Sequence, residues 1–425
     1  MTISAWWAVA LAIPVLLLGE WLVRRIPFLA RFNIPAPVVS GLLIALVLVT
    51  GHVTGWFSLK IATGVTSRWW TWVVSIEPEW LKGPSRNVNQ PLLVAFFTCI
   101  GLNASWRLLR HGSWLLLLFL ALSAVLAVAQ NLVGVPLAKA LGSPGLLGVV
   151  CGSLTLTGGI GTALGFAPEL EKAGLANAAV VSVAAATFGL VAGGLVGGPL
   201  GGWLVRRHGL QPETTAVAAE SGAVATPAGT WHDLTTLFRH GRPALVHALV
   251  LVVCLKGGVW LSHLIQQTGI MFPIYMGALL LGVAARNVAD TFCVGFIRTE
   301  IVDTIASLTL GLFLVIAMMS LNLADLAHTA VPMLVILAAQ IVLIVLFAAL
   351  VTFPLLGRSY DAAVMSAGLI GFGLGATPNA VANMKAITQQ YGPSPRAFLV
   401  VPVVGGFMID LLNALNITAF LNFLK

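Results

Sequence analysis

One acidic residue lies inside a long apolar stretch near the end of the chain. Asp410 stands in VVGGFMIDLLNALNI, three residues before Asn413. A carboxylate in an apolar segment is costly to bury unless it binds a cation or pairs with a neighbouring group. We therefore predict that Asp410 and Asn413 bind a sodium ion, or that Asp410 faces the ammonium group of a substrate. A structural carboxylate paired to a neighbouring helix is the alternative.

Two glycine clusters form the other candidate site. They are LTLTGGIGTALGF, residues 154–166, and IGFGLGATPNAV, residues 370–381. A helix broken by glycine exposes N–H groups that bind anions, and carbonyls and hydroxyls that hold small cations. Ser153 and Asn383 flank the clusters and are added to the predicted sodium ligands. The predicted substrate-binding residues are Thr157, Gly158, Gly159, Gly161, Thr162, Gly373, Gly375, Thr377 and Asn379. The alternative is that these glycines only permit close helix packing.

The composition places both sites in a membrane protein. The 425 residues are 59% hydrophobic and 8% charged, with a mean hydropathy of +0.99, whereas soluble domains carry about 25% charged residues. Apolar runs of the length that crosses a bilayer recur along the whole chain. We predict an all-α integral membrane protein with ten crossings, at residues 5–23, 34–50, 90–104, 114–134, 175–205, 243–264, 271–285, 301–321, 329–353 and 395–424.

The positive charges are divided unequally between the loops. Taking the ten crossings in order, fourteen Lys and Arg residues fall on one side of the membrane and seven on the other. The richer side is cytoplasmic by the positive-inside rule, so both termini should face outward. The net charge of +8 is therefore explained by membrane orientation, and no nucleic-acid partner is predicted.

The order of motifs repeats in the two halves of the chain. FNIPAPVVSG is echoed by MFPIYMG, IGLNAS by MSLNLA, and each glycine cluster precedes one last apolar run. Five crossings per half make the second half inverted relative to the first. We predict a first repeat at 1–205, a cytoplasmic linker at 206–242 and a second repeat at 243–425. Each repeat should contain a re-entrant hairpin, near 144–170 and near 361–388, because broken backbone at membrane depth must line protein or a cavity.

Two further features stand outside this pattern. The segment 54–90 carries Trp69, Trp70, Trp72 and Trp80, and it is predicted to be either an interfacial helix or a packed outer loop. Lys256 lies near one end of an apolar run. We favour a snorkelling lysine there over a buried functional cation.

Long strings of the chain resemble the bacterial glutamate:sodium symporters. They are FNIPAPVVSGLL, AFFTCIGLNAS, GSLTLTGGIGTA, ATFGLVAGGLVGGP, SYDAAVMSAGLIGFGLGATPNAVANMKAIT and YGPSPRAFLVVPVVGGFMIDLLNAL. They run from the first apolar segments to the C-terminus in the order of that family. The resemblance therefore covers nearly the whole chain.

The resemblance implies a homodimeric sodium:glutamate symporter of the bacterial inner membrane, surrounded by lipid and working by an elevator movement. It places the hairpin tips on the predicted glycines, with Thr377 and Pro378. Two positions depart from the family's pattern, because Ile160 and Leu369 stand where relatives carry His. We therefore expect glutamate or a related small organic anion as the substrate. A carrier of the same fold for another amino acid or carboxylate is the alternative.

Other classes of membrane protein fit the sequence less well. A membrane enzyme would need a catalytic constellation such as H-E-x-x-H or a Ser/Lys dyad, and the sequence contains none, so no enzymatic activity is predicted. An ion channel with broken helices is excluded only by the family resemblance.

Overall fold

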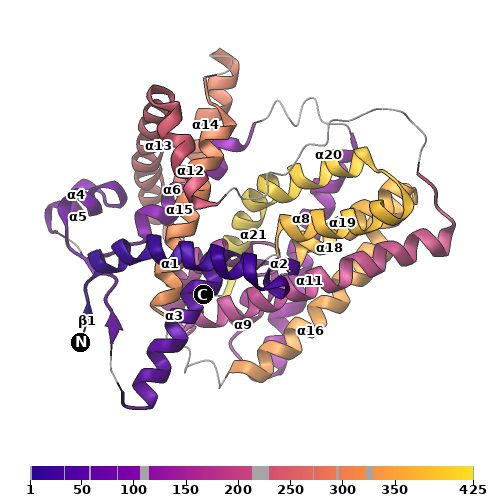
Figure 1. The fold of residues 1–425 in the computed structure, drawn as a ribbon, viewed down its shortest axis with the longest axis horizontal. Helices are drawn as coiled ribbons and strands as arrows, with labels where there is room; N and C mark the ends of the chain where they lie inside the picture. The colour runs from indigo at the N-terminus through magenta and orange to yellow at the C-terminus, as the bar shows by residue number, and fades with distance from the viewer. Residues whose placement is uncertain are drawn as a thin grey trace. The chain divides into compact units, whose positions relative to one another are not determined.

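The computed structural model describes residues 2–32, 34–56, 59–83, 85–105, 114–212, 229–270, 272–292, 296–321 and 329–424. Helices dominate every part of it (Figure 1). The chain divides into two compact units. Unit 1 is Met1–Ala30, Ile34–Arg107 and Pro227–Asp325, and unit 2 is Arg31–Asn33, Leu108–Thr226 and Leu326–Lys425.

The predicted crossings all coincide with helices. Among the described residues, seven helices are long and apolar enough to cross a membrane. The other three predicted crossings coincide with α3 (Ala36–Val53), α6 (Gln90–Asn103) and α14 (Ile274–Phe292). The molecule is thus a multi-pass membrane protein.

Unit 1 is held together by close helix crossings. Its helices are α1 (Ala5–Arg25), α2 (Pro27–Arg31), α3, α6, α12 (Thr230–His240), α13 (Arg242–Gln266), α14 and α15 (Thr299–Met319). Glycines at the α6–α14 crossing bring the two backbones together, because a Cβ on Gly101 would lie 2.2 Å from the Leu279 carbonyl oxygen. Small residues at such crossings allow the van der Waals packing that holds helices together in lipid.

The Trp-rich segment 54–90 folds into short elements, and its described residues contain no long helix. They are α4 (Arg68–Thr71), η1 (Trp72–Val74), α5 (Glu77–Leu81) and two strand pairs: β1 (Thr2–Ile3) with β2 (Lys60–Ile61), and β3 (Gly64–Val65) with β4 (Arg86–Asn87). The indole rings of Trp6 and Trp69 stack with centroids 5.3 Å apart. The structure therefore favours the packed loop over a long interfacial helix, and the position of this loop on the outer side stays a prediction.

Lys256 fastens this Trp-rich segment to α13. Its Nζ donates a hydrogen bond of 2.7 Å to the Trp72 carbonyl and another to the Ser75 carbonyl. The ammonium group also lies 4.8 Å from the Trp72 ring centroid. The carbonyls of this short helical segment thus give the Lys256 charge a protein partner, and its interpretation as a snorkelling lysine stays a prediction.

Unit 2 contains both glycine clusters. Its helices are α8 (Trp114–Ala140), α9 (Gly145–Val149), η2 (Val150–Leu154), α10 (Gly159–Lys172), α11 (Ala178–His208), α16 (Ala330–Phe347), η4 (Ala348–Thr352), α17 (Phe353–Leu355), α18 (Tyr360–Gly373), α19 (Thr377–Tyr391), α20 (Pro395–Val403), η5 (Val404–Met408) and α21 (Ile409–Leu424). Helices α18, α19 and α20 pack side by side, as the yellow part of Figure 1 shows.

The two units take matching parts from each predicted repeat. Unit 1 contains the helices of the first three crossings of each half, and unit 2 contains the last two of each half together with the glycine cluster between them. This partition follows the order of the repeated motifs. The inverted orientation of the halves stays a prediction.

Candidate functional site

Both predicted glycine clusters coincide with breaks between helices of unit 2. In the first, η2 ends at Leu154 and α10 begins at Gly159, which has a φ of +69°. Glycine adopts this left-handed conformation without steric cost. In the second, α18 ends at Gly373 and α19 begins at Thr377, with Pro378 in its first turn. Proline suits that position because it has no N–H group to leave unpaired.

The two breaks lie next to each other. A Cβ built on Gly159 would lie 3.3 Å from the carbonyl oxygen of Gly375. Gly158, Gly159, Gly161 and Thr377 are partly exposed around this contact. The Gly159 N–H already donates to the Thr155 carbonyl at 3.1 Å, and the Asn379 N–H donates to the Ala376 carbonyl at 3.0 Å. The N–H groups that follow Gly159 in α10 and the N–H of Thr377 at the start of α19 remain for an anion. These four predicted substrate-binding residues are thus accessible.

The other predicted substrate-binding residues support the breaks from within. Thr157 and Thr162 are 7% and 5% exposed, and the Thr157 hydroxyl donates to Gln130 Oε1 at 2.7 Å. Asn379 is fully buried and donates from Nδ2 to the Leu190 carbonyl at 2.7 Å. Gly373 is also buried, and its carbonyl accepts a bond of 2.8 Å from Gln130 Nε2. In this conformation Thr157, Gly373 and Asn379 hold the tips in place through these bonds, the Thr162 side chain lies beside Gly158, and Gly375 lies against Gly159.

Amide side chains surround Ser153, just before the first break. The Ser153 N–H donates to Asn131 Oδ1 at 3.0 Å, and its carbonyl accepts from Asn413 Nδ2 at 2.9 Å. Asn416 Nδ2 lies 3.2 Å from the Ser153 hydroxyl and donates to it. The Oδ1 atom of Asn413 is buried and has no hydrogen-bond partner among the described residues. A buried acceptor without a donor suits a small cation, because burying it unpaired is costly.

Asp410 lies close to this cluster in sequence. It occupies the first turn of α21, three residues before Asn413, immediately after the π-helix η5. Its side chain has neither a hydrogen bond nor an ion pair with any residue that the structure describes, although the residue is partly buried. Residues three apart share a helix face. Asp410 and Asn413 can therefore contribute oxygen ligands to one site.

Asn383 belongs to a different set of contacts. Its Nδ2 donates to the Gly193 carbonyl at 2.9 Å and lies 3.4 Å from the Ala367 carbonyl. These bonds fasten α19 to α11 and α18. Of the four predicted sodium ligands, the structure joins Ser153 and Asn413 directly and gives Asn383 another role in this conformation.

Several amides of the cluster were missed from the sequence. They are the fully buried Gln130, Asn131 and Gln340 and the partly buried Asn416. The first three interrupt the apolar strings AVAQNLVG and LAAQIVL. A polar side chain inside a membrane helix marks a partner or a pathway, so that signal was present in the sequence.

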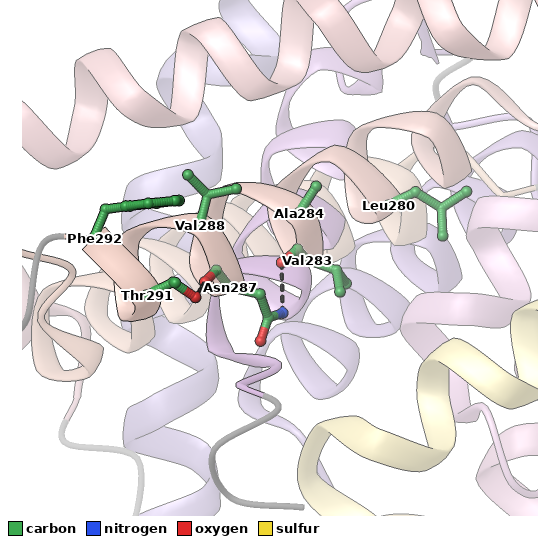
Figure 2. Close-up of a pocket in the computed structure, with 7 residues that line it drawn as sticks. All are labelled: Leu280, Val283, Ala284, Asn287, Val288, Thr291 and Phe292. Carbon is green, nitrogen blue, oxygen red and sulfur yellow. Dashed lines mark hydrogen bonds between the residues drawn. The ribbon is translucent and has the colours of Figure 1, made fainter.

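A shallow hollow in unit 1 has a different character. Figure 2 shows the residues lining it, all on α14: Leu280, Val283, Ala284, Asn287, Val288, Thr291 and Phe292. Asn287 Nδ2 donates to the Val283 carbonyl at 2.7 Å and to the Ala104 carbonyl at 3.0 Å. None of these lining side chains carries a charge, so the hollow suits lipid better than an ionic substrate.

Comparison with known proteins gives a consistent match over nearly the whole chain. The family model described as sodium/glutamate symporter matches residues 1–71 and 81–393. It leaves 72–80, part of the Trp-rich segment, and 394–425, which contains Asp410 and Asn413, unmatched. The sodium/glutamate symporter of Escherichia coli K12 is 39% identical over 96% of this chain and 94% of the relative. That of Haemophilus influenzae is 37% identical over 97% and 96%.

A solved structure was also found. It is that of the sodium proton antiporter of Methanocaldococcus jannaschii at pH 8, with a TM-score of 0.41 and 14% identity over 98% of this chain and 97% of that chain. A superposition this loose does not establish a shared fold.

Proposed function

Because the chain belongs to the sodium/glutamate symporter family, we propose that it is a secondary transporter that imports glutamate together with sodium. The observation that carries this proposal is the pair of adjacent helix breaks in unit 2, beside a buried Asn413 oxygen without a hydrogen-bond partner. The breaks supply sites for an anion and the amide cluster supplies oxygens for a cation. The chain is a transporter and not an enzyme.

The proposed substrate site is the accessible surface of the two tips. Glutamate brings carboxylates that need donors in a site away from water. The N–H groups that follow Gly159 lie at the N-terminus of α10, and the Thr377 N–H lies at the N-terminus of α19. N–H groups at a helix N-terminus suit a carboxylate. Thr377 donates its hydroxyl to the Gly405 carbonyl, which fixes the start of α19 against the segment that leads to Asp410.

The proposed sodium site is centred on Ser153. Asn413 Oδ1 and the Ser153 hydroxyl are oxygen ligands within one hydrogen-bonded cluster. The Asp410 carboxylate, one turn before Asn413, supplies the negative charge. Sodium is a coupled substrate here, and its binding would compensate a carboxylate that lacks a partner among the described residues.

The transport cycle is proposed to follow the elevator mechanism. Both breaks belong to unit 2, which has its own core, so this unit can act as the moving transport domain. Unit 1 would be the scaffold and would form the homodimer within the bilayer. The inner membrane, outward termini and inverted repeats belong to the same proposal, supported by the unequal division of Lys and Arg between the loops.

Uptake by purified protein in proteoliposomes tests this function. We expect labelled glutamate to accumulate with an inward sodium gradient and not with potassium in its place. Asp410→Asn should shift sodium activation to at least roughly tenfold higher concentrations, since one lost charge interaction at an enclosed site is worth more than about 1.4 kcal/mol. Glu171→Gln, which removes an exposed carboxylate from the same unit, is the matched control.

Two outcomes would contradict the proposal. Sodium-independent glutamate uptake by the parent would remove sodium coupling. Normal sodium activation in Asp410→Asn would remove Asp410 from the cation site while leaving the symport itself intact.

A further inference from the structure

We propose that Gln130 and its neighbour Asn131 form the physical link between sodium binding and the geometry of the two substrate-binding tips. This inference rests on the proposed function and adds positioning residues to it. Both lie on α8 and are fully buried. Neither side chain is placed in direct contact with the substrate.

Gln130 connects the two breaks through both ends of its amide. Its Nε2 donates to the Gly373 carbonyl at 2.8 Å, and its Oε1 accepts from the Thr157 hydroxyl at 2.7 Å. A carbonyl can only accept, so the amide orientation is fixed by its partners. Any shift of Gln130 therefore alters both breaks together.

The bond to Gly373 completes the end of α18. The three carbonyls before Gly373 accept backbone N–H groups from residues 374–376, whereas the Gly373 carbonyl accepts from Gln130. The last carbonyls of a helix need partners from outside it. Without Gln130, one buried carbonyl at the second tip would lose its donor, at a cost of about 1–3 kcal/mol.

Asn131 carries the other end of the link. Its Oδ1 accepts the Ser153 N–H at 3.0 Å, so it holds the residue on which the proposed sodium site is centred. Its Nδ2 is buried without a partner among the described residues. Gln130 and Asn131 are consecutive residues of one helix. A movement of Ser153 on cation binding would therefore shift Asn131, and with it Gln130 and the two tips that Gln130 contacts.

Gln340 holds this part of α8 in place from a second helix. Its Nε2 donates to the Gln130 carbonyl at 2.7 Å. Gly134 and Gly148 let α8 and α9 approach closely, because a Cβ on Gly148 would lie 2.2 Å from the Gly134 carbonyl oxygen. The link is thus built into rigid, closely packed backbone, where two sites can be coupled energetically.

The test measures how sodium changes glutamate affinity. In the parent protein we expect saturating sodium to lower the glutamate Kd by roughly tenfold or more, within the usual range of coupling between sites. Gln130→Met keeps the length of the side chain and removes both hydrogen bonds. We expect it to bind sodium as the parent does, while its glutamate Kd changes less than about twofold with sodium.

Two further variants separate linkage from simple structural damage. Thr157→Val removes one of the two Gln130 bonds and should lose part of the sodium effect on the glutamate Kd. If Gln130→Met does not fold, this variant tests the link in its place. Ser123→Ala removes a buried hydroxyl that, among the described residues, donates only to the Phe119 carbonyl of its own helix α8. It should keep the full sodium effect.

The outcomes test the Gln130–Asn131 link separately from the proposed sodium:glutamate symport. No sodium effect on glutamate binding in the parent would overturn the proposed symport. A sodium effect in the parent that persists unchanged in Gln130→Met and Thr157→Val would overturn the link alone. An equal loss in Ser123→Ala would also overturn it, because any buried polar change in α8 would then suffice.

Discussion

The two helix breaks use similar clusters of glycine for different physical reasons. At the first break, Gly159 has a φ of +69°, so the backbone conformation itself requires glycine. At the second break, none of Gly371, Gly373 and Gly375 has a positive φ. There the requirement is space, because a Cβ on Gly371 would lie 2.4 Å from the backbone of Ala380.

The two glycine requirements predict that substitutions at Gly371 affect folding, whereas substitutions at Gly159 affect the geometry of the tip. Gly371 lies at the packed contact between α18 and α19, away from the exposed surface of the tips. Gly159 lies at the partly exposed contact between the two tips. Substitutions at the second cluster should therefore affect assembly of the hairpin, and substitutions at Gly159 should affect what the tips can bind.

The largest effect is expected at Gly371. Gly371→Ala places a methyl group against backbone atoms, which cannot rotate away as a side chain can. The cost should reach or exceed the upper end of about 3 kcal/mol usual for overpacking. We expect a strongly lowered Tm in detergent and little folded protein.

Gly198→Ala provides the matched control for Gly371. A Cβ on Gly198 would meet the nearest side-chain atom, Ala386 Cβ, at an ordinary 3.8 Å, and alanine favours helix. Its Tm should equal or exceed that of the parent. A Gly371→Ala protein as stable as Gly198→Ala would show that α18 and α19 can separate without cost.

A smaller and more specific effect is expected at Gly159. Gly159→Ala forces a left-handed conformation on a residue with a side chain, at a cost of about 1–2 kcal/mol. If the tip relaxes to avoid that strain, the N–H groups of α10 turn away and the KM for glutamate rises about tenfold. Folding should survive, because the new Cβ meets only the Gly375 oxygen, at 3.3 Å.

Asparagine at the same position sharpens the comparison. Asn tolerates positive φ better than Ala, so Gly159→Asn should keep the backbone and lose less affinity wherever conformation is the cause. Equal losses in both variants, measured as KM in proteoliposomes, would show instead that bulk between the tips is the cause.

The broad architecture could be predicted because it depends on patterns that run along the chain. Each of the ten predicted apolar runs coincides with a helix, seven of them long and apolar enough to cross a membrane among the described residues, and both glycine clusters coincide with helix breaks. Asp410 and Asn413 were predicted as sodium ligands because polar groups are rare in apolar segments, and Ser153 was predicted from its place beside the first cluster. The structure joins Ser153 to Asn413 by a hydrogen bond, and their binding of sodium stays a prediction.

The remaining contacts depend on which segments meet in space. Asn383 looked like a ligand from its place after the second cluster, yet its amide donates to carbonyls of α11 and α18. The carbonyl partners of Lys256, at Trp72 and Ser75, could not be predicted because they lie more than 180 residues away in sequence. Hydrophobic pattern contains no information about such pairs.

The smallest expected effect concerns the chemistry around the first tip. Ile160 follows Gly159 directly and is 6% exposed, whereas Leu369 is fully buried within α18. A His at position 160 can therefore reach the tip surface by a small rotation, while a His at 369 would need a buried partner for its ring nitrogens.

The single variant Ile160→His is thus the informative one, with Ile160→Leu as its apolar control. If an imidazole at this position binds the substrate in relatives, Ile160→His should discriminate better between glutamate and other amino and dicarboxylic acids. The expected improvement is a fewfold, which corresponds to one hydrogen bond of about 1 kcal/mol. Competition of labelled glutamate uptake measures this directly. Identical competition profiles for both variants would show that the first tip recognises its substrate through backbone alone, as its glycine conformation suggests.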